Sequence, residues 1–193
     1  MHNIKRHRLE QFSDGVIAIA ITLLAFELKV PHLIDNDLTA SFFQILKLLP
    51  TVLTFVLSFV TIAIFWVNHH QMTEHINTIS RKIIWSNVLF LMFLAMIPFA
   101  TRVIAENPHH PLSVATFGSV MFLCSFSFSV THLLIHKRIN KSLSMKSKLI
   151  ERSLVGPILY ASATVAAFNY VPIAYFLLAI PPLYYFLPKK TQG

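Results

Sequence analysis

The sequence of 193 residues is poor in several residue types, and each shortage excludes a class of protein. It has one cysteine, Cys124, so a single chain forms neither a disulfide framework nor a cysteine-based metal site. Charged residues make up only 12% of the chain, about half of the share in a soluble domain, whereas hydrophobic residues make up 55%. We therefore expect an integral membrane protein with one domain over residues 1–193.

Six apolar stretches alternate with polar loops, and they predict an all-α protein with six transmembrane helices. Pro50 fits the first turn of the second helix, which we expect to begin near Leu48, and Pro98 should kink the third helix near its outer end. The last two stretches are short and rich in proline, so a hairpin that dips into the membrane and returns competes with two full spans. The stretches are Phe12–Val30, Phe43–Val67, Ile83–Ile104, Leu112–Ile135, Leu154–Phe168 and Pro172–Leu187.

The net charge of +8 has a one-sided distribution. Of the 16 lysines and arginines, 13 lie in the N-terminus, the second and fourth loops and the C-terminus. By the positive-inside rule this places both termini in the cytoplasm, and it accounts for the basic balance without a nucleic-acid partner. The leading segment has no small-residue cleavage site, so we expect no cleavable signal peptide.

The first apolar stretch has two distinct faces when it is drawn as a helix. One face carries alanines that should let a neighbouring helix come close, and it comprises Asp14, Ala18, Ile21, Ala25 and Leu28. The other face carries bulky rungs and one hydroxyl, and it comprises Phe12, Gly15, Ile19, Thr22, Leu23, Phe26 and Val30. An apolar stripe of this kind, taken alone, is most often in contact with lipid or with a bundle core.

Charged and polar residues stand where this stretch enters the membrane. Arg8, Phe12, Ser13 and Asp14 form the pattern R-x-x-x-F-S-D. The pattern resembles the signature of the transmembrane protein 175 (TMEM175) family, which comprises potassium channels of animal endosomes and lysosomes with single-repeat prokaryotic relatives. The resemblance extends to Trp66-x-x-His69 at the end of the second stretch, to Asn87 in the third and to the six-helix layout.

The resemblance implies that these residues form a structural network and have no catalytic role. A carboxylate and a guanidinium at the membrane edge need several hydrogen-bond partners where water is excluded. We therefore expect the network to fix the first helix in place. Its members are Arg8, Phe12, Ser13, Asp14, Trp66, His69 and Asn87.

The Phe-Ser-Asp motif occurs once, whereas animal members of the family carry two six-helix repeats. The resemblance therefore implies a homotetramer with a central pore, because closed rotational symmetry is the usual way to surround an axis. With four glycines and no T-V-G-Y-G, the chain lacks the carbonyl-lined filter of familiar potassium channels. Side chains must then form the constriction.

The candidate rungs are Ile19, Leu23 and Phe26, with Thr22 beside them as a ligand for a partly hydrated cation. The resemblance implies that Ile19 is the narrow point. We expect passive, potassium-favouring conduction of monovalent cations in a cell membrane, without a cofactor and without enzymatic chemistry. A proton-permeable leak channel and a secondary cation transporter are the alternatives.

Two polar segments have weaker functional interpretations. Glu27, Asp35 and Asp37 near the first outer loop could concentrate cations at the pore mouth, but a solvated loop would have the same composition. The segment N-H-H-Q-M-T-E-H, expected in a cytoplasmic loop, matches no recognised metal-ligand pattern, so we expect no metal site. His109 and His110 in the next outer loop could sense pH.

Overall fold

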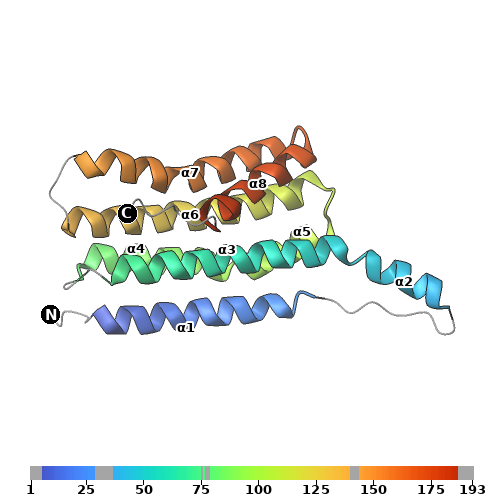
Figure 1. Ribbon diagram of the computed structural model, residues 1–193, viewed down its shortest axis with the longest axis horizontal. Helices are drawn as coiled ribbons and strands as arrows, with labels where there is room; N and C mark the ends of the chain where they lie inside the picture. The colour runs from blue at the N-terminus through green and yellow to red at the C-terminus, as the bar shows by residue number, and fades with distance from the viewer. Residues whose placement is uncertain (1–5, 29–36, 75, 77–78, 140–143, 187–193) are drawn as a thin grey trace, which may run out of the picture.

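The computed structural model describes residues 6–28, 37–74, 76, 79–139 and 144–186, and every regular element in these residues is an α-helix. The helices lie side by side in an elongated bundle (Figure 1). The all-α prediction is therefore confirmed. The helices are α1 (Arg6–Ala25), α2 (Leu38–Leu46), α3 (Leu49–Thr73), α4 (Arg81–Ala95), α5 (Ile97–Glu106), α6 (Pro111–Ile139), α7 (Ser144–Ala167) and α8 (Val171–Phe186).

These helices form the six rods that the apolar stretches predict. Helices α4 and α5 together make the third rod, and α2 is a short helix that precedes α3. Three helical segments are long and apolar enough to cross a membrane, namely Leu38–Thr73, Arg81–Glu106 and Pro111–Lys137. Two shorter apolar helices follow, at Ser153–Ala167 and Val171–Tyr185.

Proline sets two of the helix boundaries. Pro50 lies in the first turn of α3, which begins at Leu49 as expected. Between α4 and α5 the N–H of Met96 turns back to the carbonyls of Phe93 and Leu94. Pro98 cannot donate the next helical hydrogen bond, so the helix is interrupted there, at the place where a kink was predicted.

Several predicted boundaries are wrong. Helix α1 ends at Ala25 and does not continue to Val30, because the N–H groups of Phe26 and Glu27 turn back to the carbonyls of Leu23 and Leu24. Helix α7 begins at Ser144, well before Leu154.

Helix α1 begins at Arg6 instead of Phe12, because Arg6 and Glu10 pair one turn apart (Nε to Oε1, 2.8 Å) and extend it toward the N-terminus. Helix α3 continues to Thr73 and does not end at Val67, so much of the segment expected in a cytoplasmic loop is helical. It continues because His69 and Met72 extend a buried face of the helix.

Helices α6 and α7 pack closely through two glycines. A Cβ added at Gly118 would lie 2.6 Å from Oγ1 of Thr164, and one added at Gly156 would lie 2.6 Å from Oγ of Ser125. The hydroxyls of Ser127 and Ser129 bond to carbonyls within α6, and that of Ser129 also donates to the carbonyl of Ser153 on α7 (2.6 Å). This contact ties the two long rods together.

The last two helices, α7 and α8, pack against each other in opposite directions (Figure 1). Helix α7 follows the length of the bundle, while α8 ends partway along it (Figure 1). The 16 residues of α8 measure about 24 Å at about 1.5 Å per residue, which is less than the roughly 30 Å of a bilayer core. The described part of α8 is therefore shorter than a full span. The 24 residues of α7 are long enough, but its apolar part covers only Ser153–Ala167.

Candidate functional site

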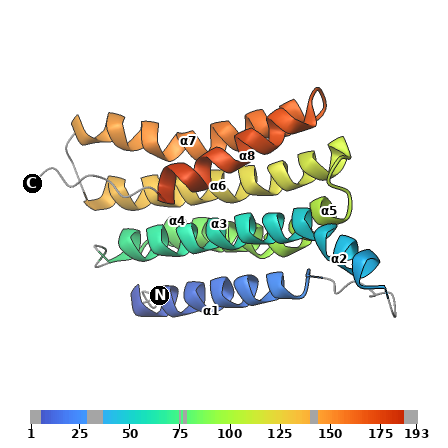
Figure 2. The same ribbon diagram turned by 45° about the vertical axis from the view of Figure 1, so that its right-hand side comes forward.

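Helix α1 lies at one edge of the bundle, on the side away from α7 (Figures 1 and 2). It packs against α3, α4 and α5 through a single face. The residues of this packed face are almost fully buried, and they are Leu9, Ser13, Ile17, Ala20 and Leu24. One face of α1 therefore makes all of the tight contacts with the rest of the protomer.

The packed face is not the alanine-bearing face that we expected from the sequence. Ala18 and Ala25 are exposed, and Ile21 is only half-buried. Asp14 lies on that alanine-bearing face, and burying its carboxylate among three apolar helices would be costly. The uncharged face that carries Ser13 is buried instead.

The face with the bulky rungs is exposed in the protomer. Ile19 is 61% exposed, Leu23 is 44% exposed and Phe26 is 82% exposed. Thr22 is exposed beside them, and its hydroxyl donates to the carbonyl of Ile19 (2.8 Å). A Cβ added at Gly15 would meet no atom within 4 Å. Ile19, Thr22 and Leu23 thus share one side of α1, and Phe26 follows in the turn that closes the helix. No other part of the described protomer covers these four residues.

A series of hydrogen bonds joins α1, α3 and α4 in the N-terminal half of α1. Nδ2 of Asn87 donates to Oγ of Ser13 (2.9 Å), and Ser13 donates to the carbonyl of Leu9 (2.8 Å). Oδ1 of Asn87 lies 2.8 Å from Nε2 of His69. Because Oδ1 can only accept, His69 is assigned the tautomer that carries its proton on Nε2. Ser13, His69 and Asn87 are at most 1% exposed, so water does not reach these hydrogen bonds.

Three more contacts hold the start of α1. Nε1 of Trp66 donates to Oδ1 of Asp14 (3.0 Å), which ties α1 to α3. Arg6, besides pairing with Glu10, donates to the carbonyl of Glu74 at the end of α3. The pairing of Arg6 with Glu10 was not predicted, although their spacing of four residues in a helix was a signal for it.

The structure brings together five of the seven residues expected in the network: Ser13, Asp14, Trp66, His69 and Asn87. Arg8 and Phe12 do not join them within the protomer. Both are exposed, and the described part of the chain gives Arg8 no hydrogen bond or ion pair.

The acidic residues near the outer loop have separate structural contacts. Oε2 of Glu27 lies 3.8 Å from Nε of Arg102 on α5, and the same Nε donates to Oε1 of Glu106 (3.2 Å). Asp37 caps α2 by accepting from the N–H of Ala40 (2.9 Å). Asp35 lies outside the described residues. Glu27 and Asp37 therefore have separate partners. The contact between Glu27 and Arg102 was not predicted from the sequence.

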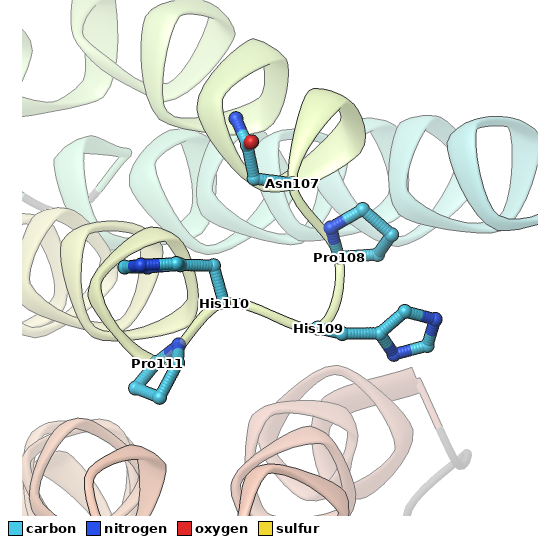
Figure 3. Close-up of a pocket in the computed structure, with 5 residues that line it drawn as sticks. All are labelled: Asn107, Pro108, His109, His110 and Pro111. Atoms are coloured by element: carbon cyan, nitrogen blue, oxygen red, sulfur yellow. The ribbon is translucent and has the colours of Figure 1, made fainter.

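The outer loop with two histidines surrounds a shallow hollow of about 390 Å³ (Figure 3). Nδ1 of His110 accepts the N–H of Leu112 (3.2 Å) and so caps the start of α6, while His109 points away from it. In the described part of the chain no three histidine, cysteine or acidic residues are grouped so that they could hold a metal ion. His70 and Glu74 lie at the end of α3 and are exposed, and His75 lies outside the described residues.

Comparisons with known proteins agree with the signature motif. A family model described as endosomal/lysosomal potassium channel TMEM175 matches residues 8–98. A protein of Chryseobacterium sp., named as a potassium channel, is 28% identical over 95% of this chain and 93% of its own length. One of Chamaesiphon minutus, also named as a potassium channel, is 40% identical over 54% of this chain, and the chain spans 51% of its length.

A solved structure matches nearly the whole fold. It is the crystal structure of a lysosomal potassium-selective channel TMEM175 homolog from Chamaesiphon minutus, with a TM-score of 0.79 and 27% identity. The match covers 93% of this chain and 95% of that chain. Vertebrate relatives such as the chicken protein, 29% of whose length the chain spans, are named endosomal/lysosomal proton channel TMEM175.

Proposed function

Because the chain belongs to the TMEM175 family of ion channels, we propose that it is a passive cation channel that favours potassium. The observation that carries this proposal is the exposed face of α1, where Ile19, Leu23 and Phe26 stand on the side opposite to the packed helices. The family consists of ion channels, and the chain is accordingly not an enzyme.

In the proposed assembly four copies surround an axis, and each turns the exposed face of α1 toward it. The position of α1 at the edge of the protomer supports this arrangement, because a helix in the middle of the bundle could not reach a shared axis (Figure 2). Closed rotational symmetry brings the same residue of every copy to the same height. Each rung of α1 then becomes a ring.

The rings define how the pore works. Four Ile19 side chains form a water-repelling collar that is closed when it dewets, and a small rotation or splay of α1 lets water and cations through. Thr22 lies one turn further along α1. Its hydroxyl proton points to the carbonyl of Ile19, which leaves the oxygen lone pairs free for a cation. Leu23 and Phe26 form the outer rings, and no cofactor takes part.

The buried hydrogen bonds among Ser13, His69 and Asn87 hold the pore-lining helix α1 in position. A polar group in an apolar interior needs its partner, so these side chains hold α1 at one height and one rotation relative to α3 and α4. The pair of Trp66 and Asp14 supports the same position from the membrane edge. Residues such as Ile19 can form a ring only if α1 has the same height and rotation in every subunit.

The chain is embedded in a membrane, and we place it in a cell membrane with both termini in the cytoplasm. Arg6, Arg8, Arg81 and Lys82 begin α1 and α4 at the same end of the bundle, which is the end expected on the cytoplasmic side (Figure 1). Phe26 and Asp37 lie at the opposite end of the bundle, which is the end expected on the outer side.

The test is Ile19→Asn in purified protein reconstituted into liposomes, with potassium flux as the measurement. A polar ring wets the collar, so we expect flux to rise by at least about tenfold, which corresponds to about 1.4 kcal/mol off the barrier. The matched control is Ile158→Asn, because Ile158 on α7 is 59% exposed and Ile19 is 61% exposed. If both variants have the same flux, Ile19 faces lipid and the proposed pore is wrong.

Proton permeation is the second candidate, since the vertebrate relatives carry that name. A collar with few ordered waters can pass protons while it excludes hydrated cations. Liposomes loaded with a pH-sensitive dye and kept free of potassium and sodium distinguish the two. Proton flux that matches the flux in potassium would favour this candidate, and a reversal potential that follows the potassium gradient would favour the first.

A further inference from the structure

Among the described residues, the ion pair between Glu27, just past the end of α1, and Arg102 on α5 is the one polar tie between this end of α1 and another helix. We propose that this pair is a latch that positions the outer end of α1 and with it the ring of Phe26. The proposal rests on the proposed function, because it assigns Arg102 a positioning role for the pore. Arg102 itself does not contact the ion path.

The end of α1 is built so that neighbouring side chains point in different directions. The N–H groups of Phe26 and Glu27 bond to the carbonyls of Leu23 and Leu24 (3.1 Å each), so a tight turn closes the helix. Glu27 follows Leu24 on the packed side and its side chain is 16% exposed, whereas Phe26 follows the exposed stripe. A movement of Glu27 therefore moves Phe26 as well.

Arg102 is held on an element that is itself fixed. Helix α5 is separated from α4 by the break at Met96, so its position depends on its own contacts. Next to Arg102, the hydroxyls of Thr101 and Ser58 form a buried hydrogen bond between α5 and α3 (2.8 Å). The latch thus joins the C-terminal end of α1 to a body formed by α3 and α5.

Elsewhere along this half of α1 the ties are apolar. From Gly15 to Phe26, the described residues include no side-chain hydrogen bond from α1 to another helix, and the Thr22 hydroxyl bonds within α1. Ile17, Ala20 and Leu24 make the contacts instead. Apolar contacts allow small rotations and slides, so the latch is the element that sets a discrete outer position.

A second interpretation of the same acid makes the opposite prediction. If Glu27 acts by attracting cations to the mouth, its neutralisation lowers conductance, and the neutralisation of Arg102 raises conductance by removing a repelling charge. If the pair is a latch, both neutral variants release the same contact. They then change gating in the same direction.

The experiment compares wild type, Glu27→Gln, Arg102→Gln and the charge swap Glu27→Arg with Arg102→Glu in planar bilayers. Open probability and unitary conductance are recorded in about 0.1 M and about 1 M KCl, where the screening length is about 10 Å and about 3 Å. Glu106→Gln is the control, because it removes a partner of Arg102 and leaves Glu27 in place. Because Arg102 is 54% exposed, we expect only about a two- to fivefold change in open probability.

The latch is supported if both single variants shift open probability in one direction at both salt concentrations, the swap restores it and the control leaves it unchanged. It is overturned if the two variants have opposite effects on conductance that vanish in about 1 M KCl, or if neither has an effect. Thermal melting of the same variants in detergent needs no conduction, so it separates this proposal from the proposed function. Should wild type conduct no cations, non-additive melting of the two single variants and the double variant Glu27→Gln with Arg102→Gln still supports the tether, and additive melting rejects it.

Discussion

The two halves of α1 are held in different ways. The N-terminal half, which we expect on the cytoplasmic side and call the inner half, is tied to α3 and α4 by fully buried polar groups, of which Ser13 and Asn87 are 0% exposed. The outer half is held by apolar packing around Leu24 and by one partly exposed ion pair. A buried polar group that loses its partner costs about 1–3 kcal/mol, whereas an exposed ion pair contributes about 0–1 kcal/mol. The inner half is therefore the fixed end of the helix, and the outer half is the end that can move at low cost.

Asn87→Ala should break the inner half and have the largest effect on stability. It removes the partner of both His69 and Ser13 and leaves a cavity, so we expect a loss of about 3 kcal/mol. Thermal melting in detergent measures it. The control is Asn68→Ala, because Asn68 is only half-buried and bonds to the carbonyl of Ile64 in its own helix. Equal losses in both variants would mean that these buried hydrogen bonds have no special role.

Leu24→Ala tests the outer half at a residue that is equally buried. Leu24 is 0% exposed, so lipid cannot fill the space that the truncation leaves. We expect a loss of about 2 kcal/mol from the cavity, without the added cost of an orphaned polar group. Leu23→Ala is the paired control, because Leu23 is 44% exposed and its truncation should hardly change the melting temperature. A larger loss for Leu24→Ala than for Asn87→Ala would reverse our comparison of the two halves.

Gly15→Ala should have the smallest effect on stability, and it tests whether anything packs against α1 where its two halves join. Alanine is favoured over glycine in a helix by about 1 kcal/mol, and a Cβ at Gly15 would meet no atom of the protomer within 4 Å. We expect melting to stay unchanged or rise slightly, whereas Gly118→Ala should lower it because its Cβ would lie 2.6 Å from Thr164. Melting that falls for Gly15→Ala would indicate that another subunit packs against this face.

Much of the fold could be predicted because proline and hydropathy act locally. Pro50 and Pro98 set helix boundaries through their missing N–H groups, and the structure has both boundaries where they were expected. The extension of α3 beyond Val67 was missed because the polar residues that follow it are typical of a loop. His69 is tolerated in a buried helix since Asn87, from another helix, satisfies its ring nitrogen.

The candidate site could be predicted only in part. The signature motif and its resemblance named Ser13, Asp14, Trp66, His69 and Asn87 before their hydrogen bonds were known. Arg8 was expected with them, yet it lies exposed and outside their contacts. The pairing of Glu27 with Arg102 was not expected at all. Such pairs form only where two helices pack together, and the local sequence pattern does not indicate which helices those are.

By itself, the sequence determined that this is a helical membrane protein whose first helix carries the signature motif. It could do so because hydropathy, proline and charge asymmetry are properties of each segment alone. It also divided that helix into faces, since a helical period relates each residue to its neighbours along the chain. Only the tertiary structure decided which face is buried and which stays open. That choice depends on polar partners from α3, α4 and α5, and the chain brings these together only when the whole bundle folds.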